Sequence, residues 1–287
     1  MACFIKNFSS SSVVVRIRIG FVSRHESESI RLVKTLVDHL QLKAELYIEP
    51  EVAQQLGMEG TPIKTMENEG VDFIISVGGD GTILRTIHKM DDPIPILGIN
   101  MGTLGFLVDV EPKDAIKTID DLLIEFDVDT RSRLRVKLND RPLPPATNEV
   151  TLITASPAKI IEFEIIVDGS LMEDFRADGV IVATSTGSTA YAMSAGGPIV
   201  DPRVDAIVLV PMAPFKLSSR PWVMPGDSLI EVNLKIPEKY ALVVIDGQNI
   251  ATISAKDKML ISRAETPARF VKASRDGFYA KVKSKLT

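Results

Sequence analysis

The sequence predicts an α/β domain followed by a β-rich domain, and three features of its pattern carry this prediction. The first half alternates short apolar runs with helical patterns, which is typical of a doubly wound α/β sheet. After about residue 127 the hydrophobic period changes to two, which indicates an antiparallel, sandwich-like domain. The last residues return to mixed character, so we expect the C-terminal tail to pack back on the first domain.

These changes of pattern divide the chain into three parts. We expect a loose leader over 1–12, whose end is the polar stretch 9–12. An α/β domain is expected over 13–127 together with about 265–287, and a β-rich domain over 128–264.

The first half justifies the α/β prediction element by element. Residues 13–22 are rich in β-branched side chains and predict a strand, and Ile30, Val33, Val37 and Leu40 lie close to one face of the helix that would cover it. The run over 71–77 is almost wholly apolar, as in a parallel strand buried on both faces. The remaining elements are strands over 44–48 and 94–99, a helical turn that opens at Pro50, and helices over 82–90 and 112–126.

The second half is dominated by predicted strands and tight turns. Residues 134–138 alternate apolar and charged side chains before an Asn139-Asp140 turn, and we expect 149–154 to be their partner strand. Strands over 159–167 and 241–245 each lead into Asp-Gly, a dipeptide that favours a hairpin turn because glycine tolerates positive φ. The exception is 188–195, a loop that opens a short helix after an apolar strand over 180–183.

Composition excludes several classes of protein. With 33 basic against 38 acidic side chains, the net charge of −5 gives no broad positive field, so we expect no nucleic-acid partner. One cysteine and three widely separated histidines offer neither a disulfide scaffold nor a zinc site. The apolar run near the amino end is interrupted by Arg16 and Arg18, which suits a strand better than a secretory signal. We therefore expect a cytoplasmic protein without a membrane partner.

The sequence GGDGT provides the first candidate site. It comprises Gly78, Gly79, Asp80, Gly81 and Thr82, between the buried strand and the next helix. At that edge of a parallel sheet, glycines let the backbone approach phosphate oxygens, and the first amides of the helix point at the anion. A carboxylate there would repel a triphosphate unless it holds a metal ion or faces the hydroxyl to be phosphorylated. The alternative is a glycine-rich turn in which Asp80 merely caps the helix.

The second candidate site is the stretch over 178–202. Residues 184–188 supply hydroxyls and a glycine, 189–194 open a short helix, and Gly196-Gly197-Pro198 ends it. One turn would then present hydroxyls and free amides together, which suits a purine, a ribose or a phosphate. Alone, the stretch fits an ordinary capped Ser/Thr-rich turn equally well.

Together these segments resemble the NAD kinase family, which phosphorylates the 2′-hydroxyl of the adenosine ribose of NAD with ATP or polyphosphate. The resemblance runs in the family's order from about residue 13 to the end. It rests on GGDGT at 78–82, TLGF at 103–106, Asn148-Glu149, R-x-D-G at 176–179, TGSTAY at 186–191, S-x-R-P at 218–221 and Asp246-Gly247-Gln248.

The resemblance implies a role for each matching residue. Asp80 would be the general base and Gly81 would give the ribose room, while Gly78, Gly79, Gly81 and Thr82 would form the phosphate-donor loop. Asn148 and Glu149 would contact sugar and adenine. The remaining substrate contacts implied are Thr189, Ala190, Tyr191 and Ser194 at the adenine, Asp178 at the nicotinamide half, Arg176 at the phosphates, and Gln248, Arg85 and Lys159 elsewhere. The family also implies Mg²⁺ with ATP and a homodimer or homotetramer; the metal ligands stay unknown.

Two residues depart from the family pattern. Ser185 stands where proline is usual, so the loop loses a fixed φ, and Phe215 replaces a histidine, which puts a hydrogen bond or subunit contact in doubt.

Three alternatives to an NAD kinase stay open. A diacylglycerol or sphingosine kinase shares GGDGT but would lack TGSTAY, a phosphofructokinase-like enzyme would need more convergent arginines, and a catalytically inactive dinucleotide sensor would keep only the pocket.

Overall fold

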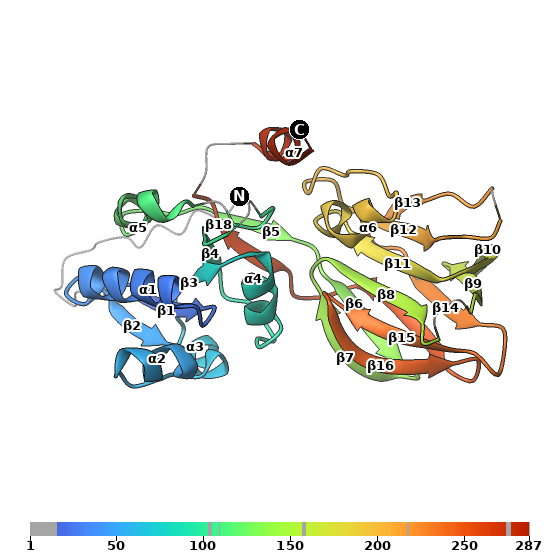
Figure 1. Ribbon diagram of the computed structural model, residues 1–287, viewed down its shortest axis with the longest axis horizontal. Coiled ribbons are helices and arrows are strands. Elements are labelled where there is room, and N and C mark those ends of the chain that lie inside the picture. The colour runs from blue at the N-terminus through green and yellow to red at the C-terminus, as the bar shows by residue number, and fades with distance from the viewer. Residues whose placement is uncertain are drawn as a thin grey trace. The chain divides into compact units, whose positions relative to one another are not determined.

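The protein is described by a computed structural model for residues 16–102, 105–108, 110–156, 159–216, 218–273 and 277–286 (Figure 1). The expected leader, the first three residues of the expected strand over 13–22, and Thr103 and Leu104 of TLGF lie outside the described residues. The chain divides into two compact units, Met1–Thr130 with Ala268–Thr287, and Arg131–Pro267.

The first unit is built on a six-stranded sheet. Its order is β2-β1-β3-β4-β18-β5, and β1 to β4 and β18 pair in parallel. The strands are β1 (Arg18–Ser23), β2 (Glu45–Ile48), β3 (Phe73–Gly78), β4 (Ile96–Asn100), β5 (Val128–Arg131) and β18 (Ala268–Val271). The pairing of β18 with β4 confirms that the chain returns to the first domain.

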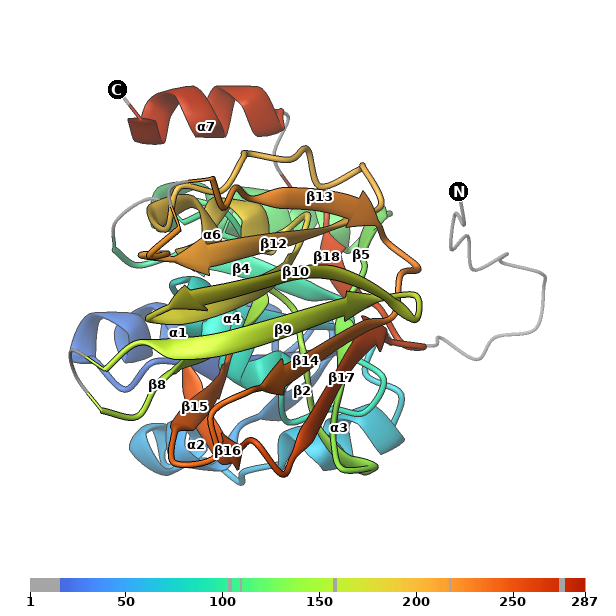
Figure 2. The ribbon, with the colours of Figure 1, turned by 90° about the vertical axis from the view of Figure 1, so that its right-hand side faces the viewer.

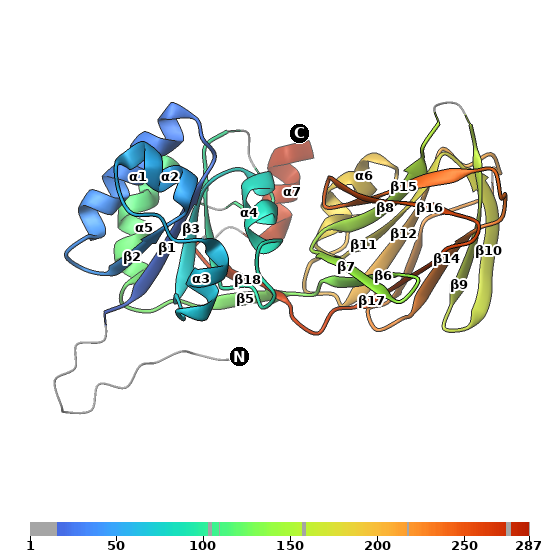
Figure 3. The same ribbon diagram turned by 90° about the horizontal axis from the view of Figure 1, so that it is seen from below.

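Helices cover both faces of this sheet, as a doubly wound fold requires (Figure 3). One core joins α1 (Ser27–Leu40), α2 (Pro50–Leu56) and α5 (Ala115–Leu122) to side chains such as Phe21 and Phe73. The opposite core joins α3 (Ile63–Asn68) and α4 (Asp80–Ile87) to Val22 and Ile74. Successive strand residues thus enter opposite cores, which explains the continuous apolar runs. The unit also contains η1 (Pro112–Asp114) and α7 (Phe278–Leu286).

The strand order locates the ligand-binding edge of this unit. The chain moves outward from β1 to β2 but passes on the other side to β3 and β4, so the order reverses between β1 and β3. In open α/β sheets ligands bind outside the carboxyl ends of the strands at such a reversal. Here those ends are Ser23 and Gly78, which places the GGDGT turn at the reversal.

The second unit is a sandwich of two six-stranded sheets around one apolar core (Figure 2). One sheet has the order β10-β9-β14-β17-β6-β7 and the other β13-β12-β11-β8-β15-β16. The strands are β6 (Leu134–Leu138), β7 (Arg141–Ala146), β8 (Glu149–Thr154), β9 (Ile161–Val167), β10 (Ser170–Ala177), β11 (Gly179–Thr184), β12 (Ala206–Met212), β13 (Trp222–Pro225), β14 (Ile230–Leu234), β15 (Tyr240–Ile245), β16 (Gln248–Ser254) and β17 (Lys258–Arg263).

Two Asp-Gly hairpins of the sandwich confirm the sequence prediction. Asp168 and Gly169 join β9 to β10, and Asp246 and Gly247 join β15 to β16; all four residues have positive φ. The predicted short helix is also present, as η2 (Gly187–Thr189) followed by α6 (Tyr191–Ser194).

One predicted pairing is wrong. Residues 134–138 form β6 as expected, but their partner through the Asn139-Asp140 turn is β7, and 149–154 form β8 of the other sheet. The sequence of β7, RPLPPA, did not suggest a strand because proline lacks the N–H that a ladder needs. It is tolerated because β7 lies at the edge of its sheet.

The structure also contains elements for which the sequence analysis gave no range, among them α3, the edge strand β5 and the C-terminal helix α7. The helix expected over 82–90 begins earlier, at Asp80, so GGDGT includes its first turn. Among the described residues, no helix combines the length and apolarity needed to cross a membrane.

Candidate active site

The GGDGT turn joins the buried strand β3 to α4, and its three glycines leave the backbone largely uncovered by side chains. A Cβ on Gly78 would lie 2.9 Å from the Cβ of Thr82, so only glycine fits there. A Cβ on Gly79 or Gly81 would meet nothing within 4 Å, so these glycines leave space beside the backbone. Because the first amides of an α-helix have no intrahelical acceptor, this open corner can hold a phosphate.

The Asp80 carboxylate is held in place by the backbone of the segment after β4. The Phe106 N–H donates to Oδ2 at 2.8 Å, and the Leu107 N–H donates to Oδ1 at 3.1 Å. A Cβ on Gly105 would lie 2.8 Å from the Asp80 Cγ, so this close approach requires a glycine. Each oxygen keeps a lone pair for another donor. The expected alternative, in which Asp80 merely caps its helix, is wrong: the N-cap of α4 is Gly79, and the Asp80 carboxylate accepts from another segment.

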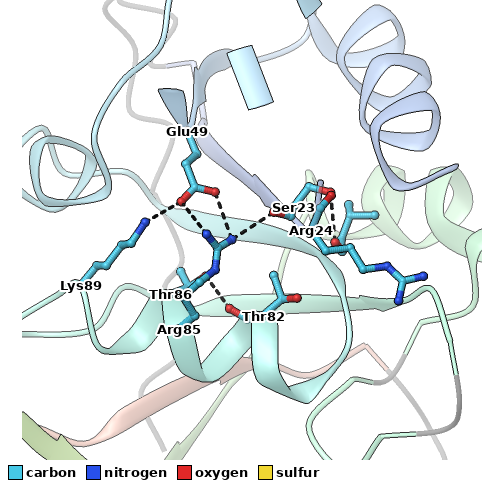
Figure 4. A network of polar contacts seen from close by, with 8 residues as sticks. Ser23, Arg24, Glu49, Thr82, Arg85, Thr86 and Lys89 are labelled. Carbon is cyan, nitrogen blue, oxygen red and sulfur yellow. Dashed lines mark hydrogen bonds and ion pairs between the residues drawn. The ribbon is translucent and has the colours of Figure 1, made fainter. Parts of the chain in front are cut away.

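Arg85 is held by a buried carboxylate (Figure 4). Glu49, at the end of β2, is fully buried, and its oxygens lie 3.3 Å from both Nη atoms of Arg85 and 2.8 Å from Nζ of Lys89. Arg85 Nη2 also donates to the Ser23 carbonyl at 3.0 Å. This pairing fixes the guanidinium at the carboxyl end of β1, beside the strand-order reversal. No pattern in the sequence singled out Glu49.

We expect Glu49→Gln to lower the free energy of unfolding by about 1–2 kcal/mol, because it leaves two cations without their shared anion. The figure lies below that for a fully buried pair because Arg85 and Lys89 keep about a third or more of their side chains exposed, at 32% and 41%. The exposed Glu51→Gln on α2 is the matched control and should cost less than about 1 kcal/mol. Equal losses for both variants in urea denaturation would contradict the network.

A second arginine, Arg24, lies at the same edge and was missed by the sequence analysis. Its backbone N–H donates to the Val77 carbonyl at 3.1 Å, Nε donates to the Ser29 hydroxyl at 3.1 Å, and Nη2 donates to the Met101 carbonyl. Its guanidinium thus joins the end of β1 to the end of β4. Only the parallel order of these strands brings it there.

In the second unit, several predicted residues meet at one end of a sheet. β8 pairs antiparallel with both β11 and β15, so the start of β8 adjoins the ends of the other two strands. Buried Asp246 accepts the backbone N–H groups of Thr147 at 2.7 Å, Asn148 at 2.8 Å and Glu149 at 3.1 Å. The hairpin aspartate thereby shapes the backbone that presents Asn148 and Glu149. Gln248 follows the same hairpin and is exposed.

The TGSTAY segment packs tightly against this backbone. Thr184 Oγ1 donates to the Thr147 carbonyl at 2.7 Å and accepts the Gly187 N–H at 3.0 Å. A Cβ on Gly187 would lie 2.7 Å from the Cα of Asn148. The two backbone segments therefore approach this closely only because residue 187 is glycine. This glycine brings the start of η2 against the Asn148-Glu149 corner.

The hydroxyl groups of this segment are mostly used internally. Ser188 donates to the Ser185 carbonyl at 2.7 Å, and Thr189, which is buried, donates to the Thr186 carbonyl at 3.2 Å. Ser185, at the position where proline is usual in the family, is buried, and its hydroxyl donates to the Val204 carbonyl, with the Ala206 carbonyl farther away at 3.3 Å, so a hydrogen bond anchors the loop there. The residues left for a ligand are the half-buried Ala190 and the exposed Tyr191 and Ser194.

Glu149 is the most perturbed acid of the site. Its side chain is buried, and Oε2 has no hydrogen-bond partner among the described residues. Burial, reinforced by the nearby charge of Asp246, raises the pKa of Glu149 to about 8, although the Tyr191 backbone N–H favours the charged form. The side chain is therefore largely protonated at neutral pH, and a protonated carboxyl group carries both a hydrogen-bond donor and an acceptor.

This pKa predicts a pH dependence of stability. Because the folded protein holds the Glu149 proton up to pH about 8 and the unfolded chain releases it near 4.5, folding takes up a proton between these values. The contribution of Glu149 to the free energy of unfolding should be fully present below pH 4.5. It should then fall by up to ~1.4 kcal/mol per pH unit as the pH rises from 4.5 to about 8. Glu149→Gln should flatten this slope in urea denaturation at several pH values; an unchanged slope would contradict the raised pKa.

The remaining predicted contacts lie apart from this group. Asp178 adjoins Thr154, whose N–H donates to its carbonyl at 2.8 Å, at the opposite end of β8 and β11; Lys159 and Arg176 are exposed near that end. Six residues of β11 separate the two ends, roughly 20 Å at 3.3 Å per residue. Arg176 stacks over the exposed Phe215 ring, at 5.6 Å from its centroid.

The described residues contain no group of three acidic, histidine or cysteine side chains suited to a metal ion. Asp80 is the carboxylate of the glycine turn. This suits Mg²⁺, which commonly binds through one or two carboxylates together with substrate phosphates.

A glycine turn with a fixed carboxylate in the first unit and a polar corner at one end of a sheet in the second unit are features that suit a phosphotransferase. Residues 19–125 match the ATP-NAD kinase N-terminal domain, and residues 147–273 match the ATP-NAD kinase C-terminal domain. The chain belongs to the NAD kinase family. These matches give no support to the lipid-kinase, phosphofructokinase-like or inactive-sensor interpretations.

Curated relatives and solved structures agree with this assignment. The chain is 54% identical to an NAD kinase of Methanosarcina barkeri, over 94% of this chain and 98% of the relative. It is 44% identical to an NAD kinase of Methanothermobacter thermautotrophicus, over 94% and 96% of the two chains. An Archaeoglobus fulgidus NAD kinase, solved in complex with ATP, is 33% identical with a TM-score of 0.76, over 93% and 99%. Yeast NADH kinase shares the fold, with 24% identity and a TM-score of 0.84 over 94% and 88%.

Proposed function

We propose that this protein transfers the terminal phosphoryl group of ATP, or of polyphosphate, to the 2′-hydroxyl of the adenosine ribose of NAD, and so forms NADP. The observation that carries the proposal is the placement of Asp80. Its carboxylate is fixed by two backbone N–H groups at the open glycine corner where the parallel strands reverse their order. A fixed acceptor beside a phosphate site suits a base that takes a proton from an attacking hydroxyl.

The glycine turn would bind the phosphate donor. Gly79 and Gly81 lie at the start of α4 and would offer backbone amides, Gly78 and Thr82 would frame this loop because the Thr82 N–H already donates to the Gly79 carbonyl, and Arg85 supplies a fixed positive charge. Positioning and charge neutralisation contribute most of the acceleration in phosphoryl transfer, because its transition state is loose. Mg²⁺ would be held by the donor phosphates and Asp80, and when bound it would offset the negative charge of the phosphates.

The Asn148-Glu149 corner would recognise the adenosine half of NAD. Protonated Glu149 offers one donor and one acceptor, Tyr191 offers a ring to stack on, and Ala190, Ser194 and Gln248 lie around the same corner. Thr189 would act through its position in the loop, because its hydroxyl already bonds to Thr186. Lys159, Arg176 and Asp178 would contact the phosphates and the nicotinamide half, farther along the sheet.

We also propose a cytoplasmic homodimer or homotetramer. The single cysteine excludes an internal disulfide, which suits a reducing compartment. Exposed apolar side chains on the edge strand β13, Trp222 at 44% and Val223 at 53%, together with Phe215 at 70%, are the kind of surface that a second copy would cover. Light scattering coupled to gel filtration would give the oligomeric state.

The decisive experiment is incubation with NAD, Mg²⁺ and either ATP or polyphosphate, with NADP read by a strictly NADP-dependent dehydrogenase. We expect NADP with at least one donor. If NAD binds but neither donor yields NADP, the proposed function is wrong and the protein is a dinucleotide-binding sensor.

A further inference from the structure

The C-terminal helix α7 brings a positive charge to the glycine turn of its own unit. It carries Lys281, Lys283 and Lys285, and none of its residues is buried. One lysine nevertheless reaches the site: Nζ of Lys285 lies 3.7 Å from the centroid of the Phe106 ring. Phe106 is the residue whose backbone N–H donates to Asp80. The end of α7 therefore lies beside the segment that positions the proposed base.

The Lys285 ammonium is partly desolvated but has no carboxylate bound to it. Burial, helped by the like charge of Lys281, holds the pKa of Lys285 below its ordinary value, although the charge of Asp80 acts in the opposite direction. Among the described residues, Asp80 interacts with Lys285 through its charge and not through a side-chain hydrogen bond. A ring face compensates part of the lost hydration. An anion that entered this corner would compensate the remainder.

We propose that Lys285 binds the terminal phosphates of the phosphate donor, an inference that rests on the proposed function. Three features meet at one place: open space beside the backbone at Gly79 and Gly81, a fixed Asp80 carboxylate, and an ammonium that packs on the Phe106 ring. The carboxylate alone would repel a triphosphate. A compact lysine charge beside it offsets this repulsion and forms charge-assisted hydrogen bonds with phosphate oxygens.

The occupant is thus a polyanionic phosphate chain rather than a nucleoside. The adenosine of the donor needs no contact with Lys285 in this proposal, and the lysine is not assigned to NAD. Removal of the charge should weaken ATP and inorganic tripolyphosphate by the same factor and leave NAD unaffected.

The test is equilibrium binding to the full chain by calorimetry, with Mg²⁺ present and with ATP, tripolyphosphate or NAD as separate ligands. Lys285→Met keeps most of the apolar stem but loses the charge, and Lys285→Arg retains the charge. Lys283→Met removes an exposed charge from the same helix and is the matched control. Thermal melting of each variant checks that the fold is intact.

We expect Lys285→Met to raise the Kd for ATP and for tripolyphosphate about tenfold or more, with the Kd for NAD unchanged. Lys285→Arg should recover at least part of the loss, and Lys283→Met should change each Kd less than about twofold. An unchanged ATP Kd in Lys285→Met, an equal loss in Lys283→Met, or tighter binding, as expected of a self-inhibitory helix, would overturn the proposal. These readouts need no turnover, so they are separate from the NADP assay that decides the proposed function.

Discussion

Asp80→Asn is expected to lower kcat at least a hundredfold while the affinity for NAD stays within about tenfold of wild type. The asparagine oxygen can still accept one of the two N–H groups that hold the carboxylate, from Phe106 and Leu107. Its amide would face the other N–H, so the side chain loses one hydrogen bond and the charge that takes the proton. Binding groups in the second unit are untouched.

Steady-state kinetics with both substrates, and NAD binding by calorimetry, measure this prediction. Asp92→Asn is a matched control, because this aspartate pairs with Arg269 at 2.6 Å, belongs to the same unit and has no part in the glycine turn. Its kcat should stay within about twofold of wild type. If Asp80→Asn weakened NAD binding by two orders while turnover stayed intact, Asp80 would be a ligand contact and not a base.

Gly187→Ala should cost about 3 kcal/mol or more in stability and weaken NAD binding at least tenfold. The added Cβ would overlap the Asn148 carbonyl group and lie 2.7 Å from the Asn148 Cα. All these atoms belong to the backbone, in a segment that Asp246 holds by three hydrogen bonds. The Asn148 segment cannot move away from residue 187 without breaking those bonds. The corner that would recognise adenosine must therefore open.

A nearby glycine separates this overlap from ordinary backbone strain. Gly196 has φ of +86° and no atom within 4 Å of an added Cβ, so Gly196→Ala should cost only about 1 kcal/mol from the unfavourable φ. Urea denaturation gives both values, and calorimetry gives the NAD affinity. Equal losses for the two variants would mean that the contact between residues 187 and 148 is unimportant.

The glycines of this protein illustrate why motifs are easier to recognise than to explain. GGDGT and TGSTAY were visible in the sequence, and the strand-to-helix position of the first was predicted. The reasons for single glycines were not visible: Gly105 makes room for Asp80, and Gly187 makes room for Asn148. Both contacts join segments far apart in the chain, and no local pattern encodes such a distance.

Strand content was predictable where local pattern and final environment agree. The runs over 71–77 and 180–183 are apolar because those strands are fully buried, and the Asp-Gly pairs form hairpins because both residues adopt positive φ. The edge strand β7 was missed, because its prolines remove the ladder donors that a strand in the middle of a sheet would need. The pairing of β6 was then assigned to the wrong strand.

By itself, the sequence determined the order of the elements, the change from α/β to β-rich structure and the family, because periodicity and short motifs are properties of neighbouring residues. Only the tertiary structure decided what those motifs touch. Glu49 holding Arg85, Asp246 holding the Asn148-Glu149 backbone, and Lys285 lying beside Phe106 each join residues that are distant along the chain. Such contacts follow from strand order and close packing, which bring side chains together regardless of their separation in sequence.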